Sequence, residues 1–71
     1  MGKTVSIGRL GEEIRTFALD DNATVDDLLA VAGITLEKGE SLAVDGESVR
    51  GSYVPENGET VYIVPSITGG Y

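Results

Sequence analysis

The C-terminal part of the chain reads Thr60-Val61-Tyr62-Ile63-Val64-Pro65-Ser66-Ile67-Thr68-Gly69-Gly70-Tyr71. Val61 and Ile63 lie two positions apart, which predicts a strand with both side chains facing inward. Pro65 has no N–H to give to a neighbouring strand, so we expect the strand to stop there. Gly69 and Gly70 have no Cβ atom. They therefore make a bare arm that could enter a narrow channel and present its carbonyl carbon without hindrance.

Upstream of this stretch, the clearest local signal is a helix between Thr24 and Ile34. Thr24 is a typical N-cap residue, and Asp27 three positions later suits the positive end of the helix dipole. The apolar residues of the segment recur at the spacing of one helical face: Val25, Leu28, Leu29 and Ala32. Gly33 is placed where a left-handed C-cap belongs, and Ile34 follows it for the apolar contact that accompanies such caps.

The N-terminal residues predict a hairpin. Residues 3–7 alternate as a first strand, residues 8–11 form a turn bracketed by glycines, and residues 12–19 return as a second strand. Ile14 and Phe17 cannot face the same way in a regular strand. We therefore expect a bulge or twist near Arg15.

The remaining segments predict three more strands. Residues 41–44 and 48–50 flank the turn signal Asp45-Gly46, and the final strand over residues 59–64 follows the turn signal Asn57-Gly58. The order is strand, strand, helix, strand, short strand, strand. One helix can cover one face of one sheet, which predicts an α+β domain of two layers over residues 1–64. Residues 65–71 are expected to form a flexible tail.

The composition limits the possible functions. The chain has 71 residues and a net charge of −7, with no cysteine and no histidine. Clustered cations, which phosphate binding requires, are missing, so we expect no nucleic-acid partner. Thiolate or imidazole metal sites, Ser-His-Asp arrangements and Cys-His pairs are all excluded. We expect no catalysis, no bound cofactor, no membrane segment and a cytoplasmic location.

One spacing resembles a calcium-binding loop. Asp20, Asn22, Thr24 and Asp26 occupy every second position, as the ligands that open such a loop do. The sixth position would have to be glycine and the twelfth glutamate, but they are Val25 and Val31. A turn followed by a helix cap explains these residues, so we expect no metal.

The element order, together with Asp45-Gly46-Glu47, Asn57-Gly58-Glu59 and the run from Val61 to Gly70, resembles the ubiquitin-like β-grasp family. The resemblance is closest to its small sulfur carriers and protein modifiers. It implies a mixed sheet of four to five strands with one helix packed across it. It also implies that the first and last strands are parallel neighbours at the sheet centre.

The resemblance places the chemistry at the C-terminal glycines. In this family an ATP-dependent activating enzyme of the ubiquitin-activating type adenylates the terminal carboxylate, which here implies Gly70 preceded by Gly69. ATP would be used by that partner, and this chain would supply a substrate tail. Tyr71 departs from the usual Gly-Gly end, which makes the bond between Gly70 and Tyr71 the candidate processing site. Ile67 and Thr68 would be the residues through which a partner recognises the tail.

Three functions remain open. The leading hypothesis is a modifier precursor that is monomeric when free. Its expected partners are an activating enzyme, a conjugating enzyme and a deubiquitinase-like metalloprotease. The second is a sulfur carrier bearing a terminal thiocarboxylate for thiamine, molybdopterin or tRNA thiolation. The third is a non-covalent β-grasp interaction module. Tyr71 could be native or an added residue, and Lys3 and Lys38 are the only lysines that could accept a conjugate.

Overall fold

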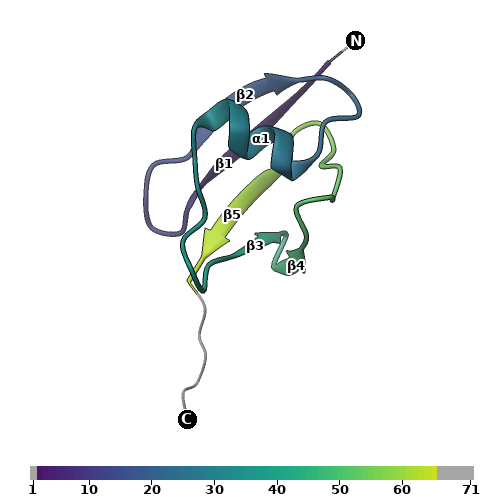
Figure 1. Cartoon of the computed structure of the whole chain (residues 1–71). Coiled ribbons are helices and arrows are strands. Elements are labelled where there is room, and N and C mark those ends of the chain that lie inside the picture. The colour runs from purple at the N-terminus through teal and green to yellow at the C-terminus, as the bar shows by residue number, and fades with distance from the viewer. Residues whose placement is uncertain (1, 66–71) are drawn as a thin grey trace.

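The structure is a computed structural model that describes residues 2–65. One helix lies across one face of a five-stranded sheet (Figure 1), which confirms the expected two-layer α+β architecture. The elements are β1 (Lys3–Arg9), β2 (Arg15–Leu19), α1 (Val25–Ala32), β3 (Ser41–Val44), β4 (Glu47–Val49) and β5 (Thr60–Val64). The helix, eight residues long, is too short to cross a membrane, and no other helix occurs within residues 2–65.

The sheet has the strand order β2-β1-β5-β3-β4. β1 and β5 run parallel at the centre, as expected, and the pairs β1–β2, β3–β5 and β3–β4 are antiparallel. The C-terminal end of β5 therefore lies at the same edge of the domain as the C-terminal end of β1. The start of β1 lies at the opposite end.

The helix begins and ends as its local sequence predicts. The Thr24 side chain accepts a hydrogen bond from the Asp27 N–H, and the Asp27 carboxylate accepts one from the Thr24 N–H at 2.9 Å. This reciprocal pair is a capping box. At the other end Gly33 has a φ of 72°, and the Ile34 N–H donates to the Leu29 carbonyl at 3.0 Å. That bond closes a Schellman motif, which satisfies a carbonyl at the helix end.

The prediction for the first hairpin was wrong in detail. Gly8 belongs to β1, where it pairs with Tyr62, and the turn instead has Gly11 at its third position with a φ of 86°. A Cβ atom on Gly8 would lie 2.6 Å from the Ile14 side chain, so this glycine permits close approach rather than a turn. The predicted bulge near Arg15 is absent, since β2 pairs residue for residue with β1 from Arg15 onward and Ile14 precedes it.

The core lies between the helix and the sheet. It consists of eleven buried apolar side chains: Val5, Ile7, Leu19, Ala23, Val25, Leu28, Ala32, Leu42, Val44, Val61 and Ile63. Val25, Leu28 and Ala32 of the predicted helix face and Val61 and Ile63 of β5 are among them, whereas Leu29 is only partly buried and packs against this cluster. Leu28 has no exposed surface, whereas Val31 on the same helix is 58% exposed.

Candidate functional site

The tail leaves the domain from a strand that is held on both sides. At the end of β5, Val64 pairs with Ser41 of β3. On the other side Ile63 pairs with Arg9 of β1, and its carbonyl accepts a hydrogen bond from the Leu10 N–H at 3.0 Å. The strand ends at Val64, directly before Pro65, as predicted. The root of the tail, by which we mean Ile63 and Val64 at the end of β5, is therefore held in place by both neighbouring strands.

The residues predicted to carry the chemistry follow this root. Ile67, Thr68, Gly69, Gly70 and Tyr71 lie outside the described residues, and so do the expectations about their mobility and recognition. The structure therefore defines where the tail starts, and the prediction of the tail's chemistry rests on its sequence.

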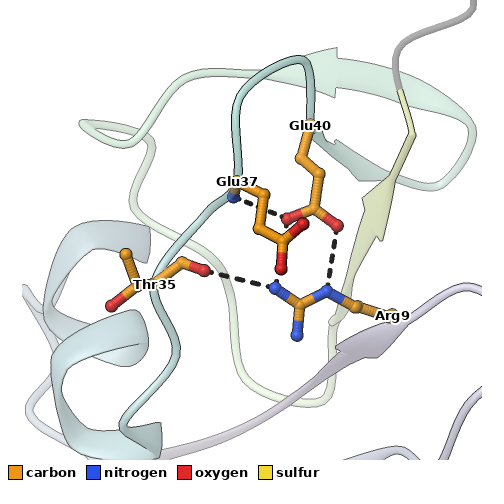
Figure 2. A network of polar contacts seen from close by, with 4 residues as sticks. All are labelled: Arg9, Thr35, Glu37 and Glu40. Atoms are coloured by element: carbon orange, nitrogen blue, oxygen red, sulfur yellow. Dashed lines mark hydrogen bonds and ion pairs between the residues drawn. The ribbon is translucent and has the colours of Figure 1, made fainter.

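A polar network lies at the same end of the domain as this root (Figure 2). Arg9, at the end of β1, donates to both carboxylate oxygens of Glu40, from Nε at 2.9 Å and from Nη2 at 3.1 Å. The same Nη2 donates to the Thr35 carbonyl at 3.2 Å. The two-pronged contact gives the ion pair a fixed geometry. It ties the segment between the helix and β3 to the centre of the sheet.

The loop that Arg9 holds contains a tight turn. The Glu40 N–H donates to the Glu37 carbonyl at 2.9 Å, and the Glu40 carboxylate accepts from the Glu37 N–H at 2.8 Å. Gly39 occupies the third turn position with a φ of 89°, as a type II turn requires. Lys38 occupies the second position, which makes it the apex of the turn.

The network shifts the pKa values of both of its charged partners. The side-chain hydrogen bond from Arg9 holds the pKa of the Glu40 carboxyl below its ordinary value of 4.5, and the Glu37 N–H lowers it further. The same hydrogen bond raises the pKa of Arg9, which is charged in any case. The two side chains are 30% and 15% exposed, so solvent screens their attraction in part.

We expect Glu40→Gln to remove a contribution to the free energy of unfolding that is present at neutral pH and is lost in acid. A carboxyl whose pKa is lowered by folding stabilises the fold above its unfolded-state pKa, and loses that effect as the pH falls through the folded-state value. The melting temperature of Glu40→Gln should therefore lie below that of the wild type at pH 7. The two should converge well below pH 4.5. A gap that is constant across this range would contradict the assignment.

A shallow groove of about 810 Å³ lies away from the tail, near the start of β1. It runs between the edge strand β2 and the helix, and its acidic lining residues are Asp20 and Asp27. Asp27 already accepts hydrogen bonds in the helix cap. Within residues 2–65 no three acidic side chains gather where they could hold a metal ion.

The strand order, the parallel central pair and the single crossing helix define a ubiquitin-like β-grasp protein. The family model described as Mut7-C ubiquitin matches residues 9–69, and the chain belongs to this family. The match covers most of the chain and reaches the first of the two terminal glycines. No match was found among curated protein sequences.

Solved structures show the same fold. The small archaeal modifier protein 1 of H. volcanii is 17% identical with a TM-score of 0.74, and the alignment covers 93% of this chain and all of that one. The ubiquitin of Caldiarchaeum subterraneum is 15% identical with a TM-score of 0.65, covering 99% and 100%. The ubiquitin-like domain of Plasmodium falciparum Dsk2 is 20% identical with a TM-score of 0.65, covering 93% and 100%.

The sequence interpretation missed the network at the tail's root. It placed Arg9 in a turn and assigned no helix, strand or role to residues 36–40. One local signal was available, because Glu37 and Glu40 three positions apart with Gly39 between them are typical of a capped turn. The partner of that turn is 31 positions away from Glu40, and no local pattern indicates it.

Proposed function

We propose that this chain is a ubiquitin-like protein modifier whose active form ends at Gly70. Cleavage of the bond between Gly70 and Tyr71 exposes the Gly70 carboxylate. An ATP-dependent activating enzyme then adenylates it: the carboxylate attacks the α-phosphorus of ATP, and pyrophosphate leaves. A thiol next displaces AMP, and a target amine displaces the thiol to form the conjugate. This chain supplies the tail, and its partners supply the catalysis.

The observation that carries the proposal is the placement of the Gly-Gly sequence after β5. The strand is anchored by β1 on one side and β3 on the other, up to Val64. Six residues then separate this anchor from the end of Gly70. An extended chain covers about 3.3 Å per residue, so such an arm could reach about 20 Å into a partner. The fold match to archaeal modifier protein 1 supports the same function.

Removal of Tyr71 is expected to switch the chain from inert to active in adenylation. The bulky side chain would lie where the arm has to be bare, and its presence moves the carboxylate one residue beyond Gly70. The measurement is ATP–pyrophosphate exchange with the cognate activating enzyme, comparing the full chain with the chain that ends at Gly70. Tyr71→Gly is the matched control, because it removes the bulk and keeps the length. Equal exchange by the full and shortened chains would refute the processing step.

The same reaction separates conjugation from sulfur transfer, the second function considered above. After adenylation, a sulfur carrier would gain the mass that corresponds to replacing one carboxyl oxygen by sulfur when a sulfur donor is supplied. A modifier would instead form amide bonds to amines. Mass spectrometry of the shortened chain after reaction with each class of acceptor decides between them.

Ile67→Ala is expected to weaken binding to the activating enzyme or protease by about 10-fold or more, because burying such a side chain contributes roughly 1.5–3 kcal/mol. Ile67 is the aliphatic residue nearest the glycines, and it follows the last anchored strand position. The melting temperature should stay unchanged. Ser66→Ala is the control within the same arm and should alter neither quantity. If Ile67→Ala lowers the melting temperature and leaves affinity intact, the residue belongs to the core.

A further inference from the structure

The two lysines of the chain have opposite environments. Lys3 is 6% exposed, although lysine is rarely buried. Its Nζ donates to the carbonyls of Asp21 at 2.9 Å, Ala23 at 2.9 Å and Pro55 at 2.7 Å. An ammonium group has three N–H donors, and all three are used. Lys3 is thus closed to any reagent while the protein is folded.

Lys38 has the opposite environment. It is exposed, and within residues 2–65 its side chain makes no hydrogen bond or ion pair. It lies at the apex of the turn that Glu37 and Glu40 close, and Arg9 fixes that turn to β1. A partly ordered loop would spread the amine over many positions, whereas this turn holds the backbone of Lys38 in one place.

We propose that Lys38 is the side-chain acceptor through which acyl groups, including the activated C-terminus of another copy, are attached to this protein. The inference rests on the proposed function for the origin of that activated carboxyl. The chain has no cysteine, and its other lysine is buried. Amide linkage between copies through a side-chain amine therefore has one accessible site.

The reaction is an aminolysis. The neutral amine of Lys38 attacks the Gly70 carbonyl carbon of an acyl adenylate or thioester. A C–N bond forms, and the bond from the acyl carbon to the AMP oxygen or the thiol sulfur breaks. The leaving group takes the electron pair, and the amine nitrogen releases one proton to water. An isopeptide bond joins the two chains.

The first test needs no activating enzyme. The folded full-length chain is treated with a small excess of an N-hydroxysuccinimide acetate, and each amine is followed by peptide mass spectrometry. Lys38 should react at least ~100-fold faster than Lys3, because a buried amine reacts only through rare openings. In concentrated guanidinium chloride the two lysines should react alike. Comparable rates in the folded protein would overturn the proposal.

The second test uses a copy of this chain as the acyl donor. A chain ending in a chemically prepared Gly70 thioester, carrying Lys38→Arg so that it cannot accept at position 38, is mixed with full-length acceptor. Peptide mapping counts lysine-linked and N-terminal products separately. The lysine-linked product should map to Lys38 and fall at least ~10-fold in a Lys38→Arg acceptor, which keeps the charge and removes the nucleophile. A product at Lys3, or an unchanged yield, would overturn the proposal.

The third test adds the activating enzyme and ATP to a chain ending at Gly70. Absence of adenylation would refute the proposed function, while the first two tests would still decide the role of Lys38. Adenylation followed by lysine linkage that survives Lys38→Arg would refute the role of Lys38 and leave the proposed function standing.

Discussion

Leu28→Ala should lower the free energy of unfolding by about 2–5 kcal/mol, the range for truncating a large buried aliphatic side chain. Leu28 has no exposed surface and lies on the helix face that covers the sheet, in the same cluster as Val61 and Ile63. Alanine would leave a cavity there that this small core has little freedom to close. A domain of this size has a total stability of roughly 4–10 kcal/mol, so the variant would lose a large part of it.

Val31→Ala is the matched control for Leu28→Ala. It lies on the same helix and is truncated to the same residue, but its side chain is 58% exposed. Its effect should stay within about 0.5 kcal/mol. Urea unfolding followed by far-ultraviolet circular dichroism measures both variants. Equal midpoints for Leu28→Ala and the wild type would mean that the buried face of the helix has been assigned wrongly.

The helix could be predicted closely from sequence because its determinants are local. Thr24 and Asp27 are three positions apart and bond to each other's backbone, and Gly33 supplies the left-handed residue that ends the helix. Each of these interactions forms within one or two turns. Their chemistry can be interpreted without knowing what the helix packs against.

The first hairpin shows why other features could not be predicted. Gly8 was assigned to a turn because glycine is common in turns, but its role is to let the Ile14 side chain approach the backbone of β1. That contact exists only after β2 has returned along β1. The same residue also pairs with Tyr62, which is 54 positions later. Sequence spacing gives no information on either contact.

Some features of the candidate site could likewise be predicted from the sequence, and others could not. The tail's chemistry could be inferred from Pro65, Gly69 and Gly70, because backbone freedom is a property of the residue type. The environment of its root could not, since Arg9 and Glu40 meet only when β1, β3 and β5 lie side by side. Nor could the difference between Lys3 and Lys38 be inferred, because burial of an amine depends on distant carbonyls.

Lys3 joins three segments of the chain. Its Nζ is bonded to the carbonyls of Asp21 and Ala23, which precede the helix, and to the Pro55 carbonyl, which precedes the turn into β5. The bonds span 18, 20 and 52 positions of sequence. Within residues 2–65 every buried side-chain nitrogen or oxygen has a hydrogen-bond partner, and the Lys3 amine is no exception.

Lys3→Met should therefore destabilise the fold by about 2–5 kcal/mol, because each buried carbonyl left without its donor costs roughly 1–3 kcal/mol and water can replace only part of the loss. Methionine keeps much of the aliphatic stem, so the change tests the ammonium group more than the packing.

Lys38→Met makes the identical substitution at an exposed position and should shift the free energy of unfolding by no more than about 0.5 kcal/mol. Urea midpoints of the two variants give the comparison. If they are equal, the three hydrogen bonds of Lys3 contribute nothing net to the fold. A lower midpoint for Lys3→Met alone would show that this lysine acts as a structural clamp, which also accounts for its protection from acylation.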